Sequence, residues 1–207
     1  MKLHLVDHPL VAARLSVLRD KTTETADFRR NLQELSGLLL MEAACAWPLA
    51  EMEIETPLRS CAGFKLARPV VLVPILRAGL GMLDGMMPLL PDAQVGHLGL
   101  YRDEKTLRPV TYYQRLPANV ADAQVLLLDP MLATGHSACA AVALLKERGA
   151  RRIQFLCVVA CPAGVEQLQS AHPEVEIVAA VVDPELNAVG YIVPGLGDAG
   201  DRYFGTE

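Results

Sequence analysis

The sequence contains no segment suited to crossing a membrane or directing export. No window of about 18 residues, the length that a transmembrane helix needs, is both apolar and uncharged. The beginning of the chain, MKLHLVDHPLVAARL, has charges and a proline where a signal peptide has an apolar run. We therefore expect a cytoplasmic protein without membrane contact.

The chain also lacks an excess of positive charge. It has 19 Lys and Arg against 24 Asp and Glu, which gives a formal net charge of -5. This balance provides no general attraction to nucleic acid, so no nucleic-acid partner is expected. An anionic substrate would have to be held by positive side chains at one local site.

Cysteine patterns typical of metal sites or disulfide frameworks are absent. The five cysteines include no CxxC pair and no zinc-like spacing. They are Cys45, Cys61, Cys139, Cys157 and Cys161. Several lie in apolar runs, so we expect reduced and mostly buried thiols. We expect no metal site built from protein ligands alone.

Apolar periodicity predicts an α/β fold. Helical spacing over 8–20 and 25–46 predicts two N-terminal helices. After Pro69 the pattern changes to short apolar runs at 70–76, 95–101, 124–129, 153–160 and 175–183. Near-continuous apolar strands indicate a parallel sheet that is buried on both faces. A helix over 137–148, ending at Gly149, would complete a strand–helix–strand crossover.

The length of 207 residues suits one domain with small additions. We divide this single domain, 1–207, into an N-terminal helical part at 1–68, a core at 69–183 and a tail at 184–207. Residues 102–117 are polar and charged, which predicts an exposed β-arm or a mobile loop over a site.

The segment LLLDPMLATGHSA at 126–138 is a candidate phosphate site. An apolar strand ends in Asp129, and a turn with Thr134, Gly135 and Ser137 opens a helix. Such a turn directs backbone N–H groups and hydroxyls outward at the positive end of the helix dipole. The alternative is an ordinary strand–helix turn with a hydroxyl cap. The GxxxxGK[ST] pattern of a Walker loop is absent.

Two arginines follow predicted strands. Arg77 lies in VPILRAGLGM beside small residues that let an anion approach, and Arg102 lies in GLYRDEKTLRP. An arginine offers forked donors to phosphate oxygens, but an arginine in either position, taken alone, is more often a solvated residue of a loop or a charged run. Of the charged stretch, Asp103, Glu104, Lys105 and Arg108 are best explained as a soluble arm.

The tail GYIVPGLGDAGDRYFGT is glycine-rich, yet Ile192, Val193 and Pro194 would be unusual in a disordered end. An ordered glycine-rich loop exposes backbone donors and acceptors to a ligand. The tail is therefore a candidate binding loop.

Taken together and in their order along the chain, the four segments resemble those of the type I phosphoribosyltransferases. DPMLATG, ILRAG, YRDE and GYIVPGLGDAGD resemble the uracil branch of that family, and the likeness runs from HPL at 8–10 to FGT at 204–206. It implies a mostly parallel sheet flanked by helices, with N-terminal helices, a β-arm and a C-terminal base-binding loop. The implied reaction joins uracil to phosphoribosyl pyrophosphate (PRPP) and yields UMP and pyrophosphate.

The resemblance also implies roles for individual residues. Asp129 would lie near the ribose hydroxyls, and residues 133–137 would wrap the 5'-phosphate. The implied PRPP-binding residues are Arg77, Arg102, Asp129, Pro130, Met131, Leu132, Ala133, Thr134, Gly135, His136, Ser137 and Asp198. The implied uracil-binding residues are Ile192, Gly197, Asp198 and Ala199, and the implied catalytic residues are Arg77, Arg102 and Asp198. Mg²⁺ would be the cofactor, held mainly by PRPP oxygens.

His136 is the main departure from the family pattern, which has a second glycine in ATGGS. Its side chain either points outward and is tolerated, or alters the phosphate cradle. Two other functions stay open: transfer to another nucleobase, and a non-catalytic nucleotide-sensing homologue. The resemblance further implies a homodimer or a higher homo-oligomer, and it admits GTP as an activator, as in some relatives.

Overall fold

The structure is a computed structural model that describes residues 2–102 and 109–206, except for the side chains of Arg102 and Pro109. Its helices are α1 (Pro9–Arg19), α2 (Thr25–Ala44), α3 (Gly79–Met86), α4 (His136–Glu147), α5 (Pro162–Ala171) and α6 (Ala199–Phe204). Its strands are β1 (Leu3–Leu5), β2 (Leu49–Glu55), β3 (Ser60–Leu66), β4 (Val70–Leu76), β5 (Gln94–Val95), β6 (His97–Arg102), β7 (Pro109–Arg115), β8 (Gln124–Leu128), β9 (Met131–Leu132), β10 (Ile153–Ala160), β11 (Glu176–Val182), β12 (Glu185–Leu186) and β13 (Ile192–Val193).

The main sheet has the strand order β1-β11-β10-β8-β4-β6-β7, with β5 beside β4 and β9 beside β10. All its pairs are parallel except β6 with β7. Every residue of β10 is buried, as is every residue of β4 except its last. The predicted mostly parallel α/β sheet is therefore confirmed, with strand limits that differ by a few residues.

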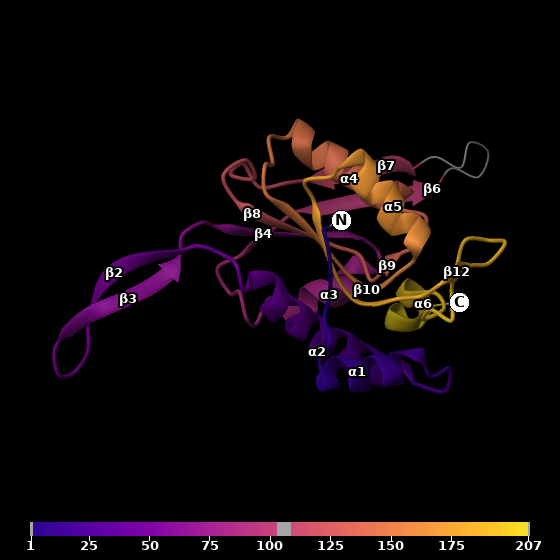
Figure 1. Ribbon diagram of the computed structural model, residues 1–207, viewed down its shortest axis with the longest axis horizontal. Coiled ribbons are helices and arrows are strands. Elements are labelled where there is room, and N and C mark those ends of the chain that lie inside the picture. The colour runs from indigo at the N-terminus through magenta and orange to yellow at the C-terminus, as the bar shows by residue number, and fades with distance from the viewer. Residues whose placement is uncertain (1, 103–108, 207) are drawn as a thin grey trace.

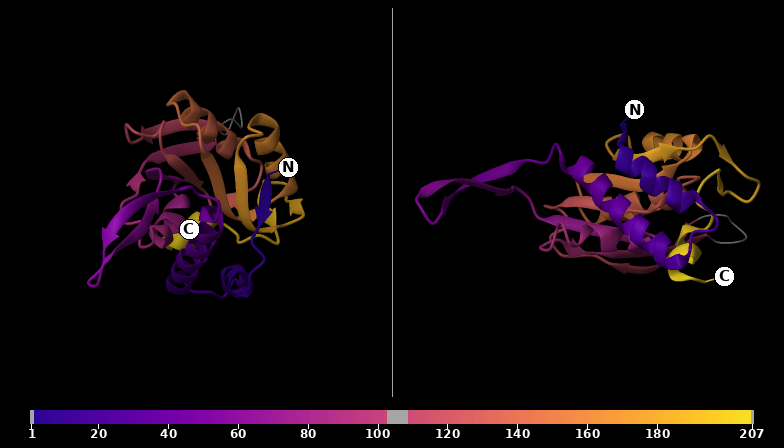
Figure 2. Two further views of the ribbon diagram at one scale, coloured as in Figure 1. Left: turned by 60° about the vertical axis from the view of Figure 1, so that its left-hand side comes forward. Right: turned by 90° about the horizontal axis from the view of Figure 1, so that it is seen from below.

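Two helical layers cover the sheet (Figure 1). Val70 and Leu72 of β4 belong to a core with helices α1, α2, α3 and α6, whereas Val71 and Val73 belong to a core with α4 and α5. Successive side chains of a strand point to opposite faces, so a strand between two layers must be apolar throughout. Figure 2 shows α1 and α2 together on one side of the sheet.

The N-terminal part contains more than the predicted helices. Strand β1 pairs in parallel with β11, and β2 and β3 form an antiparallel hairpin that projects from the body of the molecule (Figure 1). Most residues of both hairpin strands are exposed. Their sequences have neither the continuous apolar character of the sheet strands nor a helical period, and the sequence analysis missed them.

One further expectation needs correction. Cys157 and Cys161 are buried, but Cys45 and Cys61 are exposed and Cys139 is half-buried, so "mostly buried" was wrong; all five thiols are free. The exposed β-arm expected within 102–117 is confirmed for the described residues, where the largely exposed strand β7 pairs with β6 at the edge of the main sheet. Among the described residues, no helix combines the length and apolar character needed to span a membrane.

Candidate active site

The candidate site lies where the carboxyl ends of β4 and β8 meet. These strands are parallel neighbours, with Pro74 opposite Leu128, so the segments that carry Arg77 and Asp129 leave the sheet at the same edge. In open α/β sheets, ligands bind in the crevice at this edge. Strand β6, next to β4, brings the backbone of Arg102 there as well. The side chain of Arg102 lies outside the described part of the chain, as do residues 103–108.

The predicted phosphate loop forms a small hollow before helix α4. The hollow has a volume of about 80 Å³ and is lined by Asp129, Met131, Leu132, Ala133, Thr134, Gly135, Ser137 and Ala138. Gly135 precedes the helix with a positive φ of 79°, and a Cβ there would come within 2.8 Å of the Gly164 carbonyl oxygen. The loop can follow this path only with glycine at position 135. Free N–H groups of the first helical turn can bind an anion.

Three predicted loop residues do not offer side chains to this hollow. Pro130 is buried, and its carbonyl oxygen accepts hydrogen bonds from the amides of Val158 and Val159. The side chain of Leu132 belongs to the core. His136 is exposed at the first residue of α4 and is not among the lining residues. This placement agrees with an outward imidazole; the effect of His136 on PRPP stays a prediction.

Asp129 lies at the junction of two cavities. Burial raises the pKa of its carboxyl group from 3.8 to about 7, although a hydrogen bond from the Met131 amide acts in the opposite direction. Burial, and secondarily the nearby Asp129 charge, also raise the pKa of the Cys157 thiol well above its usual value. Asp129 can thus gain or lose a proton near neutral pH.

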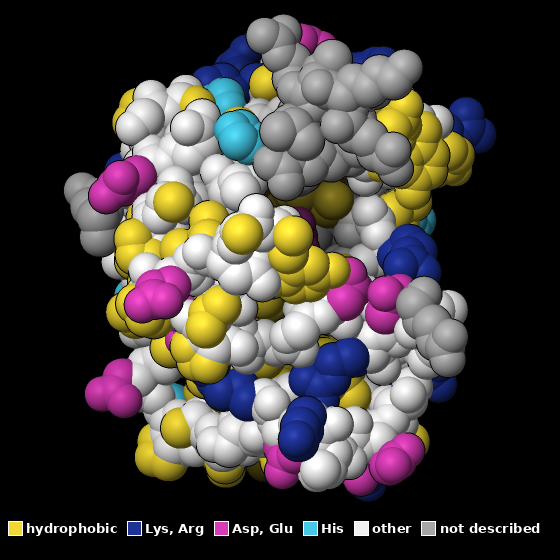
Figure 3. All heavy atoms as spheres, turned by 90° about the vertical axis from the view of Figure 1, so that its right-hand side faces the viewer, with side chains coloured by type: hydrophobic (Ala, Val, Ile, Leu, Met, Phe, Trp, Pro, Cys, Tyr) yellow, Lys and Arg dark blue, Asp and Glu magenta, His cyan; other side chains and the backbone are white. Residues whose placement is uncertain are grey.

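A second pocket of about 260 Å³ adjoins the hollow, because Asp129, Met131 and Ala133 line both. The residues predicted to bind uracil all line it: Ile192, Gly197, Asp198 and Ala199. Lining residues that the sequence analysis missed are Ala78, Val189, Gly190, Tyr191 and Gly200. Figure 3, which faces the side that carries α6 and β12 in Figure 1, shows a hollow with acidic and hydrophobic side chains at its edge.

Asp198 begins helix α6 at the wall of this pocket. One carboxylate oxygen accepts the Asp201 amide at 2.9 Å, and the other accepts the Tyr191 hydroxyl at 3.3 Å. The Asp198 charge, more than partial burial, raises the pKa of Tyr191. A Cβ at Gly200 would lie 3.2 Å from an Asp198 oxygen and 3.8 Å from a guanidinium nitrogen of Arg77. Gly200 thus lies beside both Asp198 and Arg77.

Arg77 forms hydrogen bonds with two residues near the C-terminus. Its guanidinium donates to Asp201 at 2.8 Å and to the Thr206 hydroxyl at 3.3 Å. The Thr206 hydroxyl, followed by Arg77, lowers the pKa of Asp201. The Arg77 side chain is still 55% exposed, which leaves it accessible to an anion. The sequence analysis did not single out Asp201, whose only local signal is its place in the first turn after Asp198.

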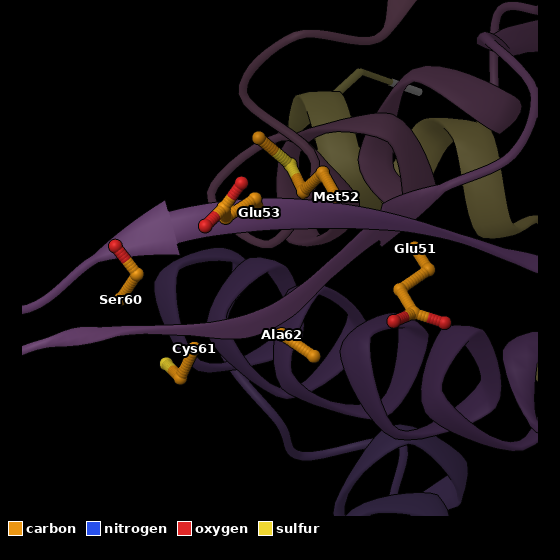
Figure 4. Close-up of a pocket in the computed structure, with 6 residues that line it drawn as sticks. All are labelled: Glu51, Met52, Glu53, Ser60, Cys61 and Ala62. Atoms are coloured by element: carbon orange, nitrogen blue, oxygen red, sulfur yellow. The ribbon is translucent and has the colours of Figure 1, made fainter.

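A hollow elsewhere in the described part of the chain lacks this combination of groups. It has a volume of about 540 Å³, lies on the projecting hairpin (Figure 4) and is lined by Glu51, Met52, Glu53, Ser60, Cys61 and Ala62. Its charged side chains are acidic, so it suits an anionic substrate poorly. Within residues 2–102 and 109–206, no group of three or more His, Cys, Asp or Glu side chains could hold a metal ion. Asp129 and Asp198 could contribute single oxygens to a cation that a ligand already chelates.

Comparisons with known proteins agree with these observations. A family model described as uracil phosphoribosyltransferase matches residues 5–206. A uracil phosphoribosyltransferase of Desulfitobacterium hafniense is 50% identical over 207 residues, which is 100% of this chain and 99% of the relative. A solved protein from Aquifex aeolicus is 37% identical, with a TM-score of 0.93 over 98% of this chain and 97% of its own. An adenine phosphoribosyltransferase from Trypanosoma brucei shares the fold, with a TM-score of 0.57 and 13% identity over 87% of this chain and 84% of its own.

Proposed function

The chain belongs to the uracil phosphoribosyltransferase family, and from this premise we propose that it transfers the phosphoribosyl group of PRPP to uracil. One observation carries the proposal: the phosphate hollow and the pocket with the four predicted uracil residues adjoin at Asp129. The products are UMP and pyrophosphate. The proposed role of the protein is therefore pyrimidine salvage.

In the proposed reaction, a ring nitrogen of uracil forms a bond to the anomeric carbon while the bond from that carbon to pyrophosphate breaks. The hollow before α4 holds the 5'-phosphate, and Asp129 lies beside the ribose. Arg77 and Arg102 stabilise the charge that grows on pyrophosphate. Arg77 would exchange its Asp201 partner for this anion. Asp198 accepts the uracil proton, through a water molecule.

Mg²⁺ fits this arrangement as a cation that arrives with PRPP. The described residues place separate carboxylates at the pocket, not a cluster of ligands. Mg²⁺ retains water and substrate oxygens and needs only one or two protein carboxylates. When bound, it would neutralise part of the negative charge of the leaving group.

Uracil is the base that we propose for the pocket, because backbone groups of the 192–199 loop would read its alternating acceptors and donor. Cytosine exchanges an acceptor for a donor and would leave buried groups unpaired. Transfer to another base and nucleotide sensing without catalysis are the two alternatives. A panel of bases separates the first alternative, and a protein that binds PRPP without turnover indicates the second.

We also propose that the protein is a homodimer or a higher homo-oligomer. The β2–β3 hairpin projects from the body and exposes Leu58 to 94% and Phe64 to 65%. An isolated two-stranded hairpin has little stability of its own, and a second copy would cover these side chains. Light scattering tests the proposal: a mass of about 22.4 kDa at micromolar concentration would show a monomer and contradict it.

The activity test combines purified protein, uracil, PRPP and Mg²⁺ and measures UMP, in parallel with Arg77→Ala. Omission of Mg²⁺ tests the cofactor, and added GTP tests activation by a purine nucleotide. We place the reaction in the cytoplasm, a reducing compartment with which the five free thiols are compatible. No UMP under any of these conditions would refute the proposed function.

A further inference from the structure

Two arginines outside the base pocket, Arg19 and Arg202, form hydrogen bonds to the backbone of the loop that lines one of its walls. Ile192 and Gly197 line the pocket, and Gly195 and Leu196 lie between them in the chain. Ile192 and Leu196 are 3% and 2% exposed and belong to the core that the sheet shares with helices α1, α2, α3 and α6. Gly195 and Leu196 are both buried, so their backbone groups need polar partners away from water.

Asp183 and Arg19 supply the first set of partners. Asp183 follows β11, and its side chain is 5% exposed. Its carboxylate accepts two hydrogen bonds from the Arg19 guanidinium, at 2.7 and 2.8 Å, and a third from the Gly195 amide at 2.8 Å. Arg19 also reaches the Gly195 carbonyl oxygen at 3.4 Å. Both backbone groups of Gly195 are thus fixed by one partly buried ion pair.

Gly195 lies in a tight turn whose backbone conformation only glycine can adopt. Its φ of +57° lies in the left-handed region, and a Cβ there would come 2.2 Å from the Ile192 carbonyl oxygen. No residue other than glycine fits this turn without moving the backbone of Ile192. The ion pair therefore fixes a tight turn that directly adjoins a pocket residue.

Arg202 supplies the second set of partners. It lies in α6, just after the pocket residues Asp198 and Ala199. Its guanidinium donates to the carbonyl oxygens of Leu196 at 2.8 Å and Asp20 at 2.6 Å, and also to that of Leu18. It lies 4.4 Å from the centre of the Phe28 ring. Arg202 thus ties the loop to the carbonyl end of helix α1.

Both arginines converge on the same place, the last turn of α1. Arg19 is the last residue of that helix, and Arg202 binds the carbonyl groups on either side of it in the sequence. Helix carbonyl ends favour cations, and arginine provides several donors in a fixed plane. Helix α1 is itself packed into the core through Val11, Leu15 and Leu18.

We propose that Arg19 and Arg202 are positioning residues for base selection, which fix the backbone of the 192–199 loop against the end of helix α1 in the geometry that accepts uracil. The inference rests on the proposed function, because it assigns the base to this pocket. Neither arginine lines the pocket or contacts the reacting atoms. They act on the base through the backbone that they hold.

The test uses Arg19→Lys and Arg202→Lys, which keep the charge but replace a planar fork of donors with one ammonium group. We expect each variant to raise KM for uracil by about 10- to 100-fold, because small displacements of binding groups have effects of this size. KM for PRPP should change by less than about 2-fold, since the phosphate hollow is lined by residues between 129 and 138 and not by Ile192, Gly195 or Leu196. The preference for uracil over cytosine should fall with the rise in KM for uracil.

Arg14→Lys is the matched control, because Arg14 lies on the same helix and pairs with Glu34 at the surface. It should leave both KM values unchanged. Circular dichroism and PRPP binding show whether each variant is folded. Folded Arg19 and Arg202 variants with normal KM for uracil, or with equal rises in both KM values, would overturn the proposal.

Hydrogen exchange in the wild-type protein provides a second test, which does not depend on whether the variants fold. The Gly195 amide should exchange as slowly as core amides, because it donates to the buried Asp183 carboxylate. Exchange of this amide as fast as that of an exposed loop would overturn the proposal that Arg19 and Asp183 fix the backbone at Gly195. A wild-type protein that makes no UMP would refute the proposed function instead, and the exchange result would still decide whether the loop is fixed.

Discussion

Asp129→Asn should stabilise the protein at neutral and higher pH, measured without added substrate, while it lowers turnover with PRPP. In the folded protein, burial raises the pKa of Asp129 from 3.8 to about 7. Between these two values the folded chain binds more protons than the unfolded chain, so the free energy of unfolding falls as pH rises. The stabilising contribution of this group is complete below pH 3.8 and is lost as pH rises through about 7.

The size of the effect follows from the two pKa values. The rise in the pKa of Asp129 from 3.8 to about 7 corresponds to about 4 kcal/mol at pH 8, and to about 2 kcal/mol at pH 5. An asparagine carries no charge at either pH and can still accept the Met131 amide. The variant should therefore gain about 2 to 3 kcal/mol more over the wild type at pH 8 than at pH 5.

Urea unfolding of both proteins at pH 5 and pH 8 measures this difference directly. Subtracting the wild-type free energy of unfolding from that of the variant at each pH removes the contribution of groups that titrate equally in the two proteins. Asp122→Asn is the control, because Asp122 is exposed and should give no such pH-dependent gain. Equal effects of Asp129→Asn at the two pH values would refute the conclusion that burial raises the pKa of the Asp129 carboxyl group.

Three further predictions concern binding and catalysis. Arg77→Ala should lower turnover by about 10²- to 10³-fold with little loss of stability, because its pair with Asp201 is exposed; wild-type turnover would remove Arg77 from the mechanism. Catalytic efficiency should favour uracil over cytosine by about 10⁴-fold, and similar efficiencies would contradict the role of the 192–199 loop. His136→Gly should change PRPP affinity little between pH 5.5 and 8. Tighter binding toward pH 5.5 in the wild type alone would show an inward imidazole.

The sheet could be predicted from sequence because its strands are buried on both faces. VVLVPIL is apolar at every position, and IQFLCVVA is apolar at every position except Gln154, as a strand buried between two layers requires. The hairpin strands LAEMEIE and SCAGFKL lie in no such layer, so their composition carries no equally clear signal. Helix α6 was missed because its six residues sit in a glycine-rich tail and are too few to show a period.

The site could be predicted where a local motif carries it. Residues 129–137 lie in one strand–helix connection, and residues 192–199 form one short segment from β13 to the start of α6, so a short pattern contains each of them. The partners of these segments come from distant parts of the chain. Arg77 meets Asp201 across 124 positions, and Arg19 meets Asp183 across 164 positions. No local pattern contains such a pair, and only the fold shows it.

The most direct measurement of the central claim is the stoichiometry of products from the purified wild-type protein. Uracil labelled in the ring, PRPP and Mg²⁺ should give labelled UMP and pyrophosphate in equal amounts, at a rate proportional to protein concentration. The same assay with Arg77→Ala should give a rate lower by about 10²- to 10³-fold, which excludes a contaminating enzyme. PRPP consumption without labelled UMP, or no consumption at all, would contradict the account.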